Sequence, residues 1–215
     1  MLLRPSPHLK IAIPPIFFWE SARADLKVES RSAFYPGHVT SRLCLTLLEK
    51  TLRSCPCRNL LDVGCGSGIL ALTAARIGVP FTVGLDIDFR AVVLSRVNGT
   101  KNGLSDRCHW YAGTVHALQG RFDCIAANLP YFVLMESVND LERLLAAEGL
   151  MILSGFHDIQ FYEVKEELLL RGLEIQETTS GDLSFCGVPP SGSFTWMAVS
   201  ATRTSSHRSK GHNER

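Results

Sequence analysis

Two hydrophobic periodicities alternate along the chain from about residue 38 onward. Apolar residues at helical spacing, such as Leu43, Leu47 and Leu48, are followed by short apolar runs of strand length. This pattern predicts helices over 40–53, 69–78, 90–103, 134–147 and 158–171, and buried strands over 59–64, 81–86, 108–112, 122–128 and 150–154. Repeated strand–helix alternation is typical of an α/β fold in which helices cover both faces of a mostly parallel sheet.

The end of the chain departs from this alternation. Two further strands are predicted over 173–179 and 194–202, with a loop and no helix between them. Consecutive strands without an intervening helix commonly pair antiparallel. We therefore expect an antiparallel C-terminal edge on the otherwise parallel sheet.

Length and composition indicate one domain with short extensions. The 215 residues are 46% hydrophobic and 20% charged, as in a globular protein. We expect a proline-punctuated lead-in over 1–37, one domain over 38–203 and a disordered basic tail over 204–215. The apolar run from Ile11 to Trp19 is short and contains two prolines, so neither a membrane span nor a signal peptide is expected.

Charge and cysteine content limit the classes of partner and compartment. The formal net charge is +1, but residues 203–215 carry four Lys/Arg and one Glu, which leaves 18 basic and 20 acidic residues in the body. A body of this charge lacks the basic surface typical of nucleic-acid binding. The odd number of cysteines, seven, indicates reduced thiols and a cytoplasmic protein. Cys55 and Cys57 have no second pair at zinc-ligand spacing, so no metal site is predicted.

The strongest chemical signal is the glycine-rich segment LDVGCGSG at 61–68, between the first buried strand and its helix. Its three glycines allow a sharp turn and a close approach of the backbone to a ligand. The segment follows a strand of a parallel sheet, and such sheets bind ligands at the carboxyl ends of their strands. No Lys-Ser/Thr pair follows, which disfavours a phosphate-binding P-loop.

A second signal, Asp86, stands at the end of the next strand, eighteen residues after Gly68. A carboxylate at this position can accept hydrogen bonds from both hydroxyls of a ribose. Loop and acid together indicate a nucleoside-containing cofactor. An NAD-binding site, and an apolar strand that ends in a tight turn, are the alternatives. Asp62 favours a sulfonium and amino group over a pyrophosphate.

A third signal, Asn128-Leu129-Pro130-Tyr131, directly follows the fourth strand. The side-chain carbonyl of Asn128 and the backbone carbonyl before Pro130 can both accept hydrogen bonds from one NH₂ group. That arrangement would aim the lone pair of the nitrogen at a reacting methyl group. Tyr131 can stack on a planar amide or base. A strand that ends in a proline turn is the structural alternative.

These motifs resemble those of class I S-adenosylmethionine-dependent methyltransferases. The glycine loop with Asp86 is similar to their first motif region, and NLPY resembles the (D/N/S)-x-P-(Y/F) motif of those that act on exocyclic or amide nitrogens. Over about 8–203 the chain further resembles bacterial lysine methyltransferases that modify a ribosomal protein of the large subunit's stalk base. The segments AFYPGHVTSRLCL at 33–45 and GLMILSGFHDIQFYEV at 149–164 carry this part of the resemblance.

The resemblance implies a seven-stranded, Rossmann-like methyltransferase sheet, S-adenosyl-L-methionine as cofactor and N-methylation of a protein amine or amide. The expected cofactor-binding residues are Asp62, Gly64, Cys65, Gly66, Ser67, Gly68, Asp86, Ile87, Thr114 and Asn128. The expected catalytic residues are Asn128, Pro130 and Tyr131, and the expected substrate-binding residues are His38, Thr40, Leu129 and Tyr131.

Three departures from the family leave the acceptor open. Its members carry an N-terminal domain that binds the ribosomal protein, and the sequence has no room for one. YPGHVTS replaces the family's GTGTHPTT, so only His38 and Thr40 correspond plainly. The family usually has a non-proline sequence after its Asn, whereas this chain has NLPY, a form also seen in ribosomal RNA adenine dimethyltransferases. We expect a protein substrate, with an adenine of a nucleic acid or a small molecule as the alternative acceptor. A non-catalytic cofactor-binding partner protein is a further alternative. The sequence assigns no catalytic role to His109, His116 or His157.

Overall fold

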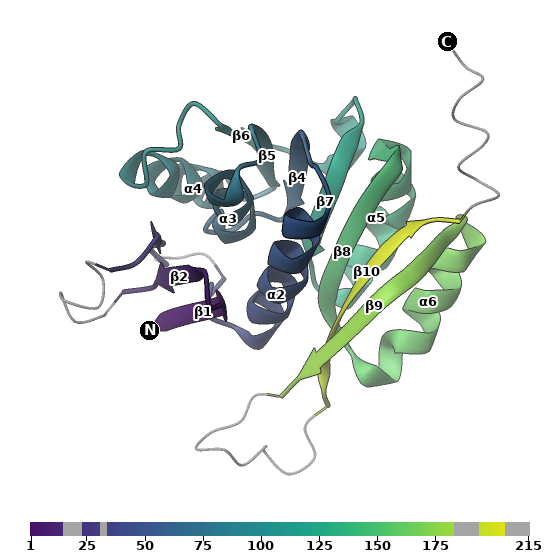
Figure 1. The fold of residues 1–215 in the computed structure, drawn as a ribbon. Coiled ribbons are helices and arrows are strands. Elements are labelled where there is room, and N and C mark those ends of the chain that lie inside the picture. The colour runs from purple at the N-terminus through teal and green to yellow at the C-terminus, as the bar shows by residue number, and fades with distance from the viewer. Residues whose placement is uncertain (15–22, 31–33, 183–193, 205–215) are drawn as a thin grey trace.

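A seven-stranded sheet runs through the middle of the protein (Figure 1). The computed structural model describes residues 1–14, 23–30, 34–182 and 194–204. The strands lie in the order β6-β5-β4-β7-β8-β10-β9. Their bounds are β4 Asn59–Val63, β5 Phe81–Asp86, β6 Cys108–Ala112, β7 Phe122–Asn128, β8 Leu145–His157, β9 Leu173–Gly181 and β10 Trp196–Arg203.

Helices cover both faces of this sheet, as the alternating periodicities predict. They are α2 Val39–Ser54, α3 Ile69–Ile77, α4 Phe89–Lys101, α5 Tyr131–Leu144 and α6 Phe161–Leu170, with short 3₁₀ turns η1 Val115–Ala117 and η2 Asp158–Gln160. The buried apolar side chains of α2, α3 and α4 form one cluster with one face of the sheet. Those of α5 and α6 form a second cluster on the other face. The apolar stripe of each helix is therefore buried against the sheet.

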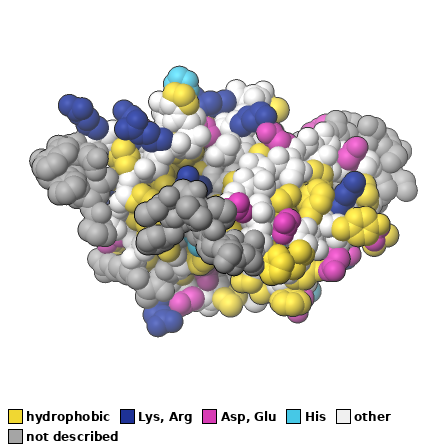
Figure 2. Space-filling model, turned by 90° about the horizontal axis from the view of Figure 1, so that it is seen from below, with side chains coloured by type: hydrophobic (Ala, Val, Ile, Leu, Met, Phe, Trp, Pro, Cys, Tyr) yellow, Lys and Arg dark blue, Asp and Glu magenta, His cyan; other side chains and the backbone are white. Residues whose placement is uncertain are grey.

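The chain changes direction across the sheet at β4. From β4 it proceeds through β5 to β6 on one side, and later through β7 to β8 on the other. All neighbouring pairs among these five strands are parallel, so their carboxyl ends lie at one end of the sheet. Figure 2 looks onto that end of the molecule. A change of this kind opens a crevice where sheets of this type bind ligands.

The antiparallel C-terminal edge predicted from the sequence is confirmed. β10 lies between β8 and β9 and runs antiparallel to both. In this register Trp196 stands opposite His157, at the end of the sheet where β7 and β8 finish. The seven-stranded, mostly parallel α/β fold expected for the chain is therefore present.

Several elements differ from their predicted bounds by more than one residue, among them α5, β8 and α6, which begins at Phe161 after the 3₁₀ turn η2 and not at residue 158. The helix expected over 134–147 is α5, which begins three residues earlier, at Tyr131. Pro130 precedes it with φ −52°, and proline suits this place because it lacks an amide hydrogen and its φ is already near the helical value. The strand expected over 150–154 extends over the whole of β8, because Leu145 is fully buried and already pairs with Phe122 of β7.

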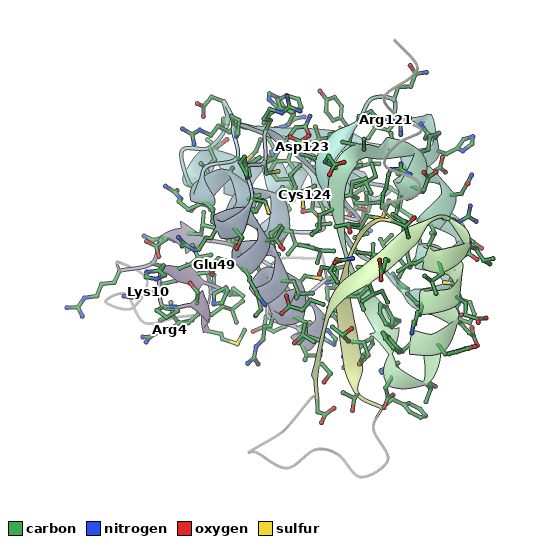
Figure 3. All side chains as sticks on the ribbon, turned by 45° about the vertical axis from the view of Figure 1, so that its right-hand side comes forward. Arg4, Lys10, Glu49, Arg121, Asp123 and Cys124 are labelled. Atoms are coloured by element: carbon green, nitrogen blue, oxygen red, sulfur yellow. The ribbon has the colours of Figure 1, made fainter. Side chains whose placement is uncertain are left out.

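The lead-in expected before residue 38 contains a second, smaller sheet. Strands β1 (Leu2–Ser6), β2 (Leu9–Ala12) and β3 (Leu26–Lys27) lie in that order, with β1 antiparallel and β3 parallel to β2. Buried Glu49 of α2 accepts a hydrogen bond from Ser6. In Figure 3 this glutamate lies between α2 and the sheet that carries Arg4 and Lys10. The lead-in is thus fixed to the main domain.

Several sequence expectations fall on residues that are not described. The second half of the apolar run that ends at Trp19, the loop around Cys186 and the expected tail from residue 205 onward lie outside the described ranges. Within the described residues, no helix is both long and apolar enough to cross a membrane.

Candidate functional site

A cavity of about 840 Å³ opens at the carboxyl ends of the parallel strands. Its walls come from the glycine loop after β4, the end of β5, the segment after β7, and the first turns of α2 and α5. A volume of this size lies within the range of small-molecule and cofactor sites. The loops that line it follow the strands on both sides of the change in chain direction at β4.

The backbone of the glycine loop has a conformation that would be strained in a residue with a Cβ atom. Gly64, Gly66 and Gly68 have φ values of +70°, +56° and +79°. A Cβ at Gly64 would lie 2.4 Å from Leu129 Cδ2, and one at Gly68 would lie 2.6 Å from the ring of Trp110. At Gly66 the nearest atom would be 4.0 Å away, so this backbone is open to a ligand. Gly68 is the one expected cofactor-binding residue that does not line the cavity.

Asp86 connects the glycine loop to the turn after β5. Its Oδ2 accepts a hydrogen bond of 2.9 Å from Gly66 N, and its Oδ1 accepts one of 2.9 Å from Asp88 N. Each carboxylate oxygen has a second lone pair, so the group can still accept two hydroxyl donors from the cavity. Asp88 caps α4 by accepting a hydrogen bond from Arg90 N.

Asp62 lies beneath the loop and is 1% exposed. Burial raises the pKa of its carboxyl to about 7, and the charge of Asp86 contributes to the rise, although a 3.1 Å hydrogen bond from Ala71 N opposes it. The group therefore changes charge near neutral pH. A cation bound beside it would favour the charged form.

Two polar residues of α4 hold the glycine loop from behind, and sequence reasoning missed both. Ser95 donates a hydrogen bond of 2.9 Å to Gly66 O, and Asn98 donates one of 2.9 Å to Ser67 O. Both side chains are fully buried. The sequence did contain a signal, namely two polar residues three positions apart on the apolar face of a predicted helix. Buried polar groups need hydrogen-bond partners, so such a pair indicates a contact with another segment.

The segment after β7 forms the far wall of the cavity. Asn128 Nδ2 lies 3.3 Å from Ser41 Oγ of α2, to which it donates. Within the described residues the Oδ1 atom of Asn128 makes no hydrogen bond, so it is free to accept one. Leu129 N donates to Ser154 O over 3.1 Å, and a Cβ at Gly155 would lie 1.8 Å from Leu129 O. The backbone of the segment is therefore fixed closely against β8.

Tyr131 stands at the mouth of the cavity and is tied to α6. Its hydroxyl donates a hydrogen bond to Glu163, which raises the pKa of Tyr131. Its ring lies 5.2 Å from that of Phe132. No sequence motif indicated that Glu163 contacts Tyr131, because the two residues lie more than thirty positions apart on different helices.

His38 and Thr40 stand together at the start of α2. His38 Nδ1 accepts a hydrogen bond of 3.3 Å from Thr40 N and thereby caps the helix. Burial lowers the pKa of His38, and the neighbouring His157 lowers it further. Since Nδ1 is an acceptor, the neutral ring carries its proton on Nε2.

An aromatic wall, also missed from the sequence, continues from His38. The ring of Trp196 lies 5.2 Å from that of His38 and 3.8 Å from that of His157, and all three line the cavity. Phe34 extends the wall outward, 4.9 Å from His38. These residues come from three segments that are distant in sequence. The pairing of β8 with β10 is what brings His157 and Trp196 together. No local pattern could reveal them.

The carboxylic acids of the cavity wall have no lysine or arginine beside them among the described lining residues, so the wall is acidic. Of the described residues that line the cavity, none is a lysine or an arginine. Four are carboxylic acids, at positions 62, 86, 88 and 136. The remaining expected site residues also lie on its wall, with Ile87 81% exposed at the rim. Such a cavity suits a ligand that carries positive charge and hydroxyl groups.

The chain is similar in sequence to one protein family over most of its length. The family described as "Ribosomal protein L11 methyltransferase (PrmA)" matches residues 18–183. A protein of that name from Pelobacter propionicus is 38% identical over 144 residues, which are 66% of this chain and 45% of that protein. One from Pelotomaculum thermopropionicum is 33% identical over 190 residues, 85% of this chain and 57% of that protein. The chain spans about half the length of the curated relatives that it matches.

Solved structures share the fold. A ribosomal protein L11 methylase from Lactobacillus delbrueckii subsp. bulgaricus superposes with a TM-score of 0.77 at 22% identity, covering 94% of this chain and 98% of that one. A putative RNA methyltransferase from Pyrococcus horikoshii gives a TM-score of 0.65 at 14% identity, covering 81% and 88%. At these identities the likeness establishes the methyltransferase fold alone.

Proposed function

The chain belongs to the ribosomal protein L11 methyltransferase family, and from this premise we propose that it transfers a methyl group from S-adenosyl-L-methionine to an amine nitrogen of a protein. The observation that carries the proposal is a single cavity in which the glycine loop and Asp86 lie opposite Asn128, with four carboxylic acids and no lysine or arginine among its described lining residues.

The cofactor end of the cavity is assigned to the loop and its acids. Asp86 accepts hydrogen bonds from the ribose hydroxyls while it keeps its hydrogen bond from Gly66 N. The open backbone at Gly66 allows a close approach. Asp62 provides a carboxylate for the cationic methionine end, where a positive ligand would hold it ionised. When bound, S-adenosylmethionine supplies a methyl group on an already activated sulfonium carbon.

The acceptor end is assigned to the segment after β7. Asn128 Oδ1 and the carbonyl of Leu129 accept hydrogen bonds from the incoming amine, and Pro130 fixes the direction of that carbonyl. An amine that arrives protonated would first lose one proton to solvent, which exposes its lone pair. Transfer would then form the nitrogen–carbon bond and break the carbon–sulfur bond, whose electron pair would leave with S-adenosylhomocysteine, and the methylated nitrogen could lose a second proton. The contribution of the residues is therefore orientation, since effective molarity alone can supply much of the rate.

The charge of the cavity favours a protein amine over a nucleic acid. A nucleic acid would bring phosphates to a mouth that lacks lysine and arginine among its described residues and carries Glu136. A lysine or N-terminal amine would instead arrive as a cation. The relatives are named for ribosomal protein L11, and we propose a ribosomal protein as the acceptor of this chain as well.

The proposed site also indicates where the catalytic unit of the chain lies. We place the catalytic unit at 38–203, because the described residues of the cavity fall there apart from Phe34 and Pro36. The small N-terminal sheet supports that unit through α2.

Transfer of label from radioactive S-adenosylmethionine tests the proposed acceptor. The chain is incubated separately with ribosomal proteins, ribosomal RNA and small amines, and we expect label in a protein band. Label in RNA alone would replace the acceptor with a nucleic-acid amine. Cofactor binding by calorimetry without transfer to any of the three would contradict catalysis and support a non-catalytic partner protein.

A further inference from the structure

Apolar side chains from the first turns of two helices rim the mouth of the cavity. Phe132 and Val133 of α5 are 75% and 45% exposed, and both line the cavity. Ile159 of η2 and Tyr162 of α6 are 61% and 67% exposed. We call these four residues the apolar rim. Large apolar side chains grouped beside a cavity indicate a surface that another molecule covers.

The two halves of the apolar rim are held to the same opening. Tyr131, next to Phe132, donates its hydroxyl to Glu163, next to Tyr162. Gln160, next to Ile159, lines the cavity and accepts a hydrogen bond of 2.9 Å from His157 N. These contacts place the start of α5 and the start of α6 on adjacent parts of the mouth.

Carboxylates outnumber basic groups beside the apolar rim, where Lys165 of α6 is the exposed cation among the described residues of η2 and α6. Glu136, one turn after Phe132, is exposed and lines the cavity. Glu163 and Glu166 are exposed on α6, and Asp158 is exposed in η2. Opposite charge at the edge of an apolar contact increases the rate and selectivity of association. The chemistry of the surface therefore suits an apolar side chain with basic neighbours.

Acidic and basic residues are unevenly distributed along the chain, and the acidic excess falls in the segment that contains the apolar rim. Residues 128–170, which contain α5, β8 and α6, carry eight Asp/Glu and only two Lys/Arg. The rest of the chain carries 13 Asp/Glu and 20 Lys/Arg. Figure 2 shows hydrophobic and acidic side chains intermixed on the right, toward α5 and α6. A field of this kind steers a basic partner toward the mouth.

We propose that the apolar rim and its carboxylates are the docking surface for the segment of the protein substrate that surrounds the target amine. That segment carries Lys or Arg next to the target and at least one apolar side chain. The inference rests on the proposed function: an amine that enters the cavity brings its own chain across the mouth, and α5 and α6 are what that chain meets. A nucleic acid would place phosphates against Glu136 and Glu163.

Three peptides of equal length, each with one target lysine and one leucine, test the docking surface. Their flanking residues are arginine, glutamine or glutamate. For the unchanged protein we expect KM to rise about tenfold from the arginine to the glutamine peptide and further with glutamate. In the double variant Glu136→Lys/Glu166→Lys the order should reverse. Glu174→Lys, an exposed carboxylate on β9, serves as the matched control and should keep the original order.

The variant Phe132→Ser/Tyr162→Ser tests the apolar rim. Loss of its apolar contact area should raise KM for all three peptides at least threefold. Fluorescence anisotropy of the labelled peptides, with S-adenosylhomocysteine present, reads docking without turnover. Equal affinities of the three peptides, an unreversed order in the double variant, or stronger competition by an adenine-rich RNA would overturn the docking surface. Charge-dependent binding without methylation of any peptide would instead contradict the proposed function and leave the docking surface supported.

Discussion

Asp62 is the residue whose environment departs most from that of an ordinary carboxylate in the candidate site. It is buried beneath the glycine loop, and the pKa of about 7 follows chiefly from the loss of hydration. A neutral acid still joins β4 to the first turn of α3, on either side of the glycine loop, through its hydrogen bond from Ala71 N. A charged one would suit a cationic ligand. The two states connect folding with pH at one side chain and, under the proposed function, with cofactor binding as well.

The pH dependence of stability tests this environment. Because burial raises the pKa of Asp62 from 3.8 to about 7, the folded protein binds this proton more tightly than the unfolded chain. The contribution of Asp62 to the free energy of unfolding should therefore fall as pH rises from about 4 to about 7 and then level off. Relative to Asp62→Asn, the protein should lose on the order of 2–4 kcal/mol across this window.

Urea unfolding of both proteins at pH 5 and pH 8, without cofactor, measures the difference. His38 is common to both proteins, so its own lowered pKa cancels in the comparison. Unfolding free energies that change in parallel for the two proteins would show that Asp62 does not titrate in this range.

At the scale of elements, α4 connects the small N-terminal sheet region to the glycine loop. Asn98 donates to Ser67 O over 2.9 Å and to Glu29 O over 3.1 Å, and it accepts from Glu29 N over 3.0 Å. One turn later, Asn102 makes two 2.8 Å hydrogen bonds with the backbone of Lys27. Asn98 within α4 and Asn102 at its C-cap therefore both hold the lead-in, but only Asn98 also holds the glycine loop.

This difference makes the two asparagines a matched pair. Asn98→Ala should lower the free energy of unfolding by roughly 1–3 kcal/mol, because buried backbone groups lose their partner. It should also weaken S-adenosylmethionine binding about tenfold, although the side chain does not line the cavity. Asn102→Ala should lower stability but leave the affinity unchanged, as measured by urea unfolding and calorimetry. Equal affinity losses in the two variants would contradict a specific role for the contact with Ser67.

The elements that the sequence predicted well are those with a clear period and a buried face. β4, α3, β5 and β6 fall within one residue of their expected bounds, because apolar runs and glycines mark both ends. The start of α5 was wrong by three residues. The helical period continues backward through Tyr131, and only the φ of Pro130 fixes where it begins.

The remaining features depend on contacts between distant segments. The small sheet of β1, β2 and β3 has strands too short for a visible alternation, and it is stabilised by packing onto the main domain. His157 and Trp196 meet through the register of β8 with β10. Such pairings are set by the whole fold, so motifs within one segment could indicate the glycine loop but not this aromatic wall.

At the scale of the whole molecule, the two ends of the sheet differ in chemistry. The carboxyl ends carry the cavity and its acids. At the amino end of β7, Asp123, labelled in Figure 3, binds Arg58 through its carboxylate. The acidic α5–α6 region lies beside the cavity, whereas most basic residues lie elsewhere in the chain. Parallel strands make this separation possible because the loops that follow them all lie at the carboxyl end of the sheet, while the loops that precede them lie at the amino end.

We propose that one cavity holds a cofactor end at Asp86 and an acceptor end at Asn128. The most direct test measures S-adenosylmethionine affinity by calorimetry and methyl transfer at saturating cofactor for Asp86→Ala and Asn128→Ala. We predict at least a tenfold loss of affinity for Asp86→Ala, and near-normal affinity with at least a hundredfold loss of turnover for Asn128→Ala. Unchanged affinity in the first variant, or unchanged turnover in the second, would contradict the account.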